Sequence, residues 1–375
     1  MLYNLNNIDK IFYNNKEYSS IYIKNKEIFT NEKLEEFIIL YGGNSSGVRF
    51  LDPKTLNQLY YLDTGFPVFS IAYIKNDAFA VSSGNIGDMS IYIYKLNKDN
   101  NNFELKDTIS EINGVELEVE QGTGIKQTVF YYNNYLYCFS VPKTYEFSIK
   151  AIYYDSNTFS IRMAKNCNIT DKIEGFEKGI YYVSSQGHFQ IIDNYFSVLG
   201  NGRASIYKIL SENSIQRIGN YNSSSLRPVY PLKDEKYLLL KNGLISGKIS
   251  TFAYLREGNN DISTIDSNGI FYFNSRYSKF SYFNNKYYIS GGENAQPIFK
   301  GIVEYDNENQ TAKLLTPSMN MGSDGDLDSI IVSSKGNFYL KGSTIIKSYD
   351  SKYNLLIEKD NSLYSDYKVI DTVSL

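Results

Sequence analysis

The chain has 375 residues, of which 42% are apolar and 21% are charged, and its formal net charge is −3. This composition indicates a globular protein and excludes a disordered tail. A protein that tracks nucleic-acid phosphates needs a basic surface, so the slightly acidic balance predicts no nucleic-acid partner.

Residues 1–10 carry no basic stretch followed by an apolar run, so we expect no secretory signal peptide. The longest apolar runs, such as residues 37–41, are much shorter than a membrane span. The sequence therefore predicts synthesis in the cytoplasm and no insertion into a membrane. A protein of this kind reaches the outside of the cell by lysis or as part of a particle.

Near the N-terminus, residues 11–17 and 21–27 repeat one pattern at a spacing of ten. In each copy apolar residues alternate with polar ones, and an Asn-Lys turn follows. The pattern predicts a small antiparallel β unit, to which we assign residues 1–33. An alternative interpretation is a first strand pair that closes or caps the following domain.

The rest of the chain, residues 34–375, is dominated by short apolar and aromatic runs that are typical of strands. One unit recurs: a turn of Asn, Asp or Lys leads into an aromatic strand, and a second pair of strands follows around a polar turn. These turns start at residues 76, 133, 193, 234, 284 and 335.

The spacing of these starts averages about 52 residues, which leaves room for four short strands and their turns. A further unit fits upstream, over residues 37–59, which makes seven units. We therefore expect an all-β fold: a seven-bladed β-propeller with about 50 residues per blade and a small N-terminal β extension. The alternative is a pair of β-sandwiches with similar turns.

Two segments resemble known families. Residues 284–292, followed by residues 303–306, resemble a kelch-type propeller repeat, although the tryptophan usual in that repeat is absent from the chain. Residues 10–29 resemble a segment of tail and appendage structural proteins of phages that infect low-GC Gram-positive bacteria.

The second resemblance implies a multi-copy component of a virion or phage-tail-like particle, with other virion or tail proteins as partners. It also implies that the N-terminal repeat attaches the protein to the particle. The apolar residues predicted to make this attachment are Ile11, Tyr13, Ile21, Ile23 and Ile28.

Residues that carry catalytic or metal chemistry are scarce. His188 is the single histidine, and the two cysteines, Cys138 and Cys167, lack the spacing of metal ligands, so we interpret both as buried apolar residues. Residues 324–328 place carboxylates at alternate positions, as a calcium loop does, but Ser329 and Lys335 stand where an EF-hand has Gly and Glu. We therefore predict no catalytic residue, no metal and no cofactor.

These observations predict a non-enzymatic recognition protein. Exposed tyrosines and asparagines on the propeller loops suit the binding of host-surface carbohydrate or of a neighbouring subunit, because a tyrosine offers both an apolar face and a hydroxyl. The alternatives are an intracellular kelch-like scaffold for a protein partner and, third, a propeller that hydrolyses glycans.

Overall fold

The structure is a computed structural model, and in the strands of residues 11–30 it describes the backbone alone. The described residues are 11–13, 16–18, 20–23, 26–30, 36–42, 45–85, 88–112, 115–116, 128–143, 146–172, 194–200, 203–211, 214–222, 226–231, 236–241, 252–256, 262–264, 280–291, 301–309, 311–315, 327–342, 344–360, 362–367 and 369–375. Within these ranges no helix is long and apolar enough to cross a membrane.

The chain divides into two compact units, one of residues 1–36 with 374–375 and one of residues 37–373. In the first unit, β1 (Ile11–Tyr13) pairs with β2 (Lys16–Tyr18), and β3 (Ser20–Ile23) pairs with β4 (Lys26–Thr30). Each copy of the sequence repeat therefore turns back on itself as a hairpin. These antiparallel strand pairs agree with the predicted small antiparallel β unit.

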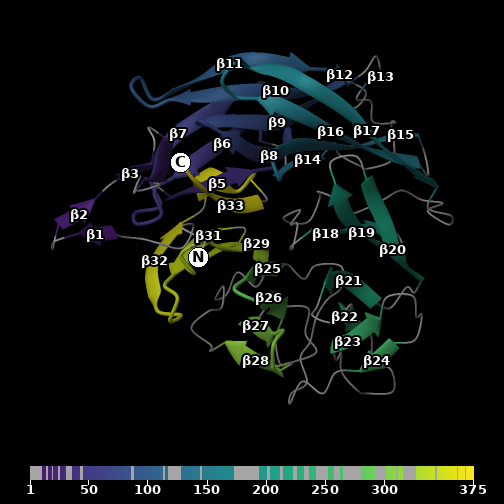
Figure 1. Ribbon diagram of the computed structural model, residues 1–375. Coiled ribbons are helices and arrows are strands. Elements are labelled where there is room, and N and C mark those ends of the chain that lie inside the picture. The colour runs from purple at the N-terminus through teal and green to yellow at the C-terminus, as the bar shows by residue number, and fades with distance from the viewer. Residues whose placement is uncertain are drawn as a thin grey trace. The chain divides into compact units, whose positions relative to one another are not determined.

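The second unit consists of antiparallel sheets of neighbouring strands (Figure 1). The strands, sheet by sheet, are β5 (Glu36–Tyr41), β6 (Gly47–Leu51) and β7 (Gln58–Asp63) with β33 (Val369–Ser374); β8 (Val68–Lys75), β9 (Ala78–Asn85), β10 (Asp88–Asn97) and β11 (Asn102–Ile109); β14 (Thr128–Tyr132), β15 (Tyr135–Lys143), β16 (Glu146–Asp155) and β17 (Ser160–Lys172); β18 (Tyr195–Gly200), β19 (Arg203–Ser211) and β20 (Ser214–Asn222); β21 (Leu226–Pro231), β22 (Lys236–Lys241), β23 (Phe252–Arg256) and β24 (Ile262–Thr264); β25 (Phe280–Phe283), β26 (Lys286–Gly291), β27 (Gly301–Asp306) and β28 (Thr311–Leu315); β29 (Leu327–Val332), β30 (Phe338–Gly342), β31 (Ile345–Tyr349) and β32 (Leu355–Asp360).

Smaller elements connect these sheets. A two-stranded sheet of β12 (Glu111–Ile112) and β13 (Val115–Glu116) follows β11, and the short 3₁₀ helix η4 (Ser362–Tyr364) precedes β33. Among the described residues, six sheets have four strands and one has three.

In several of these sheets a two-residue turn joins the first strand to the second. A type I′ hairpin turn needs a positive φ at both central residues, and Asn and Asp tolerate this better than other non-glycine residues. Such pairs join β8 to β9, β14 to β15 and β25 to β26, at Asn76–Asp77, Asn133–Asn134 and Asn284–Asn285. The predicted turns at 76, 133 and 284 are therefore confirmed, and the start at 335 lies in the turn between β29 and β30. The starts at 193 and 234 lie outside the described residues.

Inner strands such as β30 are buried on both faces, and the sheet of β29–β32 packs against a neighbouring sheet on each side. In β30, Leu340 belongs to an apolar cluster shared with the sheet of β25–β28, whereas its neighbour Tyr339 belongs to a cluster shared with the sheet of β5–β7 and β33. Side chains of consecutive strand residues point to opposite faces. A third cluster joins the sheets of β8–β11 and β14–β17.

Four-stranded antiparallel sheets that pack face to face in this way form a β-propeller, so the all-β propeller prediction is confirmed and the two-sandwich alternative is wrong. The structure shows five blades, fewer than the seven predicted. The number of sheets is larger, since seven sheets in the described ranges have three or more strands. In Figure 1 the sheet of β5–β7 takes its remaining strand, the yellow β33, from the C-terminal end of the chain.

Candidate functional site

A cavity of about 170 Å³ lies among β5, β8, β14 and β33. Three of these strands, β8, β14 and β33, are edge strands of three different sheets. The cavity is lined by three tyrosines, Tyr41, Tyr73 and Tyr131, together with Phe130, Asp371, Ser70 and the aliphatic residues Ile71, Ala72 and Val129.

A buried hydrogen bond fixes the two strands that supply most of the wall. The backbone N–H of Val129 in β14 donates to the Ser70 hydroxyl in β8, over 2.8 Å. Ala72 and Val129 also belong to the apolar cluster between the two sheets, and Tyr131 packs against that cluster. Residues of the packed interior therefore form part of the cavity wall.

The tyrosines of the cavity remain protonated at neutral pH. Burial, followed by the negative charge of Asp371, raises the pKa of Tyr41 well above its ordinary value. Burial is also the main cause that raises the pKa of Tyr73 and of Tyr131, both of which are partly exposed. Each phenol is therefore neutral and keeps its O–H.

The cavity wall includes one acidic side chain, that of Asp371. Among the described residues that line it, Asp371 is acidic and none is Lys, Arg or His. One of the Asp371 carboxylate oxygens accepts a hydrogen bond from the backbone N–H of Thr372, over 2.6 Å. Aromatic rings, hydroxyls and one carboxylate make this wall suited to binding a ligand.

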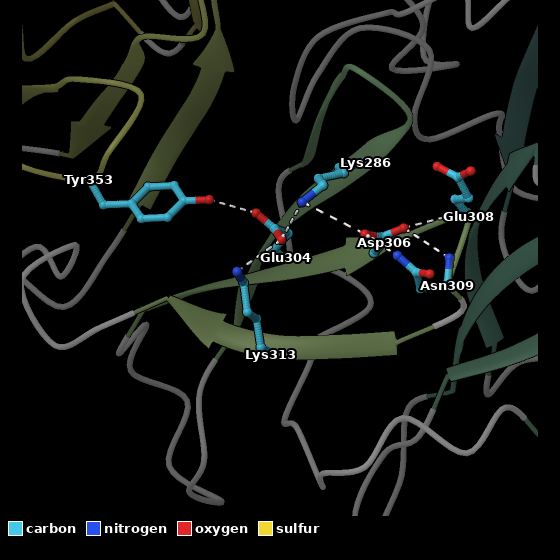
Figure 2. A network of polar contacts seen from close by, with 7 residues as sticks. All are labelled: Lys286, Glu304, Asp306, Glu308, Asn309, Lys313 and Tyr353. Atoms are coloured by element: carbon cyan, nitrogen blue, oxygen red, sulfur yellow. Dashed lines mark hydrogen bonds and ion pairs between the residues drawn. The ribbon is translucent and has the colours of Figure 1, made fainter.

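A polar cluster that is distinct from the cavity joins β26–β28 to the turn after β31 (Figure 2). Glu304 is only 3% exposed, and its carboxylate lies 2.9 Å from the ammonium of Lys286 and 3.2 Å from that of Lys313. The Tyr353 hydroxyl donates to the same carboxylate over 2.6 Å. Burial alone would raise the pKa of Glu304, but the hydrogen bonds from Tyr353 and Lys286 hold it below its ordinary value.

This cluster extends to the turn that follows β27. Asp306 lies 3.7 Å from the ammonium of Lys286 and accepts the backbone N–H groups of Glu308 and Asn309, each over 3.0 Å. Figure 2 shows the donors converging on the two carboxylates. Because Glu304 is held by two ammonium groups and a phenol, we assign the cluster to fold stability and not to proton exchange with a substrate.

The predicted attachment residues lie in the N-terminal hairpins. Ile11 and Tyr13 are in β1, Ile21 and Ile23 are in β3, and Ile28 is in β4. The described backbone places Tyr13 opposite Lys16 and Ile23 opposite Lys26. Their role in attachment stays a prediction.

The structure describes only some of the residues that were considered for catalytic or metal chemistry. Cys138 is buried in β15 and belongs to an apolar cluster, which confirms its expected role in the core. His188 and residues 324–326 lie outside the described residues. Within the described ranges, no three His, Cys, Asp or Glu side chains lie close enough together to hold a metal ion.

The sequence alone does not indicate the cavity. A signal was present for Tyr73 and Tyr131, because each lies just before the turn that starts a repeat, at Asn76 and Asn133. No such signal existed for Asp371. Its position depends on the pairing of β33 with β5, two strands that lie at opposite ends of the chain.

No protein-family model matches the chain, and no curated protein is detectably similar to it in sequence. Among solved structures, it is similar to a Bacteroides uniformis protein described as a "putative 6-phosphogluconolactonase", with 12% identity and a TM-score of 0.53 over 90% of this chain and 100% of that one. The chain is a β-propeller.

Two further propeller neighbours are a protein from Lactobacillus plantarum and apo AztD from Citrobacter koseri. Each is 10% identical, the TM-scores are 0.47 and 0.44, and 90% of this chain is covered together with 99% and 98% of theirs. At these identities the similarity shows the fold alone. None of these matches supports the kelch-type or the phage-tail resemblance.

Proposed function

We propose that this propeller is a non-enzymatic recognition protein of a phage tail, baseplate or phage-tail-like particle. The N-terminal hairpins attach it to the particle, and the propeller binds host-surface carbohydrate or a neighbouring subunit. The observation that carries the proposal is the division of the chain into a small hairpin unit and a separate propeller with an aromatic-lined cavity.

The cavity supports recognition over catalysis. Acid–base hydrolysis of a glycan uses a pair of carboxylates, and the described wall supplies one, Asp371, among neutral phenols and aliphatic groups. Tyrosine provides a large contact area at a small cost in conformational entropy. Display of many copies on a particle would strengthen a weak single site through avidity.

The proposal includes seven blades of a kelch-like type. Six four-stranded sheets and one three-stranded sheet among the described residues support the number. The pairing of β33 with β5 supports closure, since it joins the two ends of the propeller in one blade. The kelch-like type rests on the sequence of residues 284–292, of which 284–291 form a turn followed by β26.

The attachment role is tested in the full-length chain by replacing Ile11, Tyr13, Ile21, Ile23 and Ile28 together with serine. The control replaces Leu105 and Leu210, two exposed apolar residues of the propeller, with serine. We expect the first variant to fold but to be missing from purified particles, and the control to be incorporated like the wild type. Normal incorporation of the first variant, or a wild-type protein found only outside particles, would overturn the proposal.

A further inference from the structure

We propose that Arg49 and Lys359 form a binding site for an oxyanion that a carbohydrate carries, either a carboxylate or a phosphate group. The two residues come from different sheets, Arg49 from β6 and Lys359 from β32. The proposal rests on the recognition role proposed above and gives the chemical class of the carbohydrate. It follows from how the two cations are held and from what surrounds them.

The two side chains reach consecutive residues at the start of β7. The Nη1 group of Arg49 donates to the side-chain carbonyl oxygen of Gln58, and the Lys359 ammonium donates to that of Asn57 over 2.7 Å. The same ammonium also donates to the backbone carbonyl of Leu56 over 3.1 Å. Two positive charges from two sheets therefore converge on three consecutive residues.

Neither cation has a carboxylate partner in the part of the chain that the structure describes. The second hydrogen bond of Arg49 goes to another neutral group, the Tyr367 hydroxyl, over 2.9 Å. The two acidic residues beside Lys359 have other partners: Glu358 forms an ion pair with a lysine of β31 over 3.0 Å, and Asp360 accepts a backbone N–H over 2.7 Å. Because neutral acceptors do not cancel a positive charge, the site favours a negatively charged ligand.

Both cations keep donors for a ligand. A guanidinium has five N–H groups and an ammonium has three, and within the described ranges Arg49 and Lys359 use two each. The planar guanidinium matches the paired oxygens of a carboxylate or a phosphate. An oxyanion can therefore bind to both residues without displacing the contacts that hold them.

Tyrosine rings fix Arg49 and provide a surface for a sugar ring. The guanidinium lies 4.9 Å from the ring centre of Tyr61, and it lies 5.4 Å and 5.3 Å from those of Tyr364 and Tyr367. The last two rings are buried, whereas Tyr61 is 36% exposed and can contact a ligand. A Cβ atom at Gly47 would lie 2.7 Å from the Tyr61 ring, so the absence of a side chain there gives the ring its place. An exposed ring beside two positive charges favours an acidic sugar over a neutral one.

Ligand-observed NMR titration of the full-length protein tests the charge preference. The probes are glucuronate, which carries a carboxylate, glucose 6-phosphate, and neutral glucose. We expect at least one of the acidic sugars to bind at least about tenfold more tightly than glucose, because its contacts join opposite charges. Binding of only one acidic sugar would support the proposal and identify the oxyanion. Equal binding of all three sugars, or no binding of either acidic sugar to the folded protein, would overturn the proposal.

Variants locate the site. Arg49→Gln and Lys359→Gln each remove one charge and should each weaken binding of the acidic sugar at least about fivefold. Lys352→Gln removes the same charge from an exposed position in the turn before β32 and should bind within about twofold of wild type. Unchanged binding in Lys359→Gln would contradict the proposal, and so would an equal loss in Lys352→Gln. The pair of lysine variants keeps the test valid if Arg49→Gln fails to fold.

The failure of this inference is distinguishable from failure of the proposed function. If the protein is incorporated into particles through its hairpins but binds no acidic sugar, the particle role stands and the ligand class is wrong. If it binds an acidic sugar but never occurs in particles, the ligand class stands and the particle role is wrong.

Discussion

The hydroxyl of Tyr353 donates a hydrogen bond to the carboxylate of Glu304, over 2.6 Å, between residues 49 positions apart in the sequence. Tyr353 lies in the turn after β31, and Glu304 lies in the neighbouring sheet, in β27. The ring of Tyr353 also packs against Phe338, with centroids 5.4 Å apart. One residue therefore joins two sheets through a polar contact and an apolar one.

Tyr353→Phe should lower the free energy of unfolding by about 1–3 kcal/mol, because it removes a donor from a buried carboxylate while it keeps the ring. Urea denaturation measures the change. The control is Tyr282→Phe, whose hydroxyl makes an exposed contact of 3.4 Å with Asn285 and should change stability by less than about 0.5 kcal/mol. Equal effects of the two substitutions would mean that the Glu304 contact stabilises nothing.

The Glu304 cluster should give the protein a stability that depends on acid pH. The pKa of Glu304 is lowered in the folded state, so its stabilising contribution is complete above the unfolded pKa of about 4.3 and is lost as the pH falls through the folded pKa. The difference in urea midpoint between wild type and Glu304→Gln should be largest at neutral pH and should shrink at lower pH. A constant difference from pH 7 to pH 3 would contradict this assignment.

Arg49 should hold the C-terminal segment onto β6. Its Nε donates to the Tyr367 hydroxyl over 2.9 Å, and its guanidinium lies 4.9 Å from the ring centre of Tyr61 and 5.4 Å from that of Tyr364. Arg49→Lys should cost about 1–2 kcal/mol of stability in urea denaturation, because an ammonium cannot keep the same stacking and hydrogen bond together. Arg217→Lys, at an exposed position of β20, is the control and should have little effect. Similar small effects of both changes would show that Arg49 does not fasten the segment.

The contribution of Asn133 to stability should depend only on the backbone conformation that its turn requires. Its φ is +49°, which glycine adopts without strain and a β-branched residue does not. Asn133→Gly should leave the urea midpoint almost unchanged, whereas Asn133→Val should lower the unfolding free energy by about 1–2 kcal/mol. A stable Asn133→Val variant would indicate that the strand pair tolerates another turn.

The Ser70 hydroxyl should stabilise the contact between the sheet of β8–β11 and that of β14–β17. Ser70→Ala removes the acceptor for the buried N–H of Val129 and should cost about 1–3 kcal/mol. Ser281 accepts from Val332 over 2.9 Å in the same way, between β25 and β29, so Ser281→Ala should cost a similar amount. Ser46→Ala, at an exposed position, is the control in the same thermal and urea experiments.

Local features of the fold could be predicted from the sequence, because local chemistry decides them. The Asn pairs at 133 and 284 require positive φ values, and this requirement marks the starts of sheets. The N-terminal repeat likewise predicts a small antiparallel β unit, and β1 pairs antiparallel with β2 as β3 does with β4.

The candidate site could not be predicted, because it depends on contacts between distant residues. Asp371 reaches the cavity only through the pairing of β33 with β5, and Glu304 acquires its third donor only when Tyr353 comes from the next sheet. With 41 acidic residues in the chain, no local pattern distinguishes these two carboxylates from the others.

Electron microscopy of particles from the source culture, with antibody labelling of this protein, tests the proposed particle role. We expect label on tails or baseplates, and a disc with seven-fold blades in images of the purified protein. Label found only on free protein, in a culture whose particles carry none, would contradict the particle role and would favour a free scaffold.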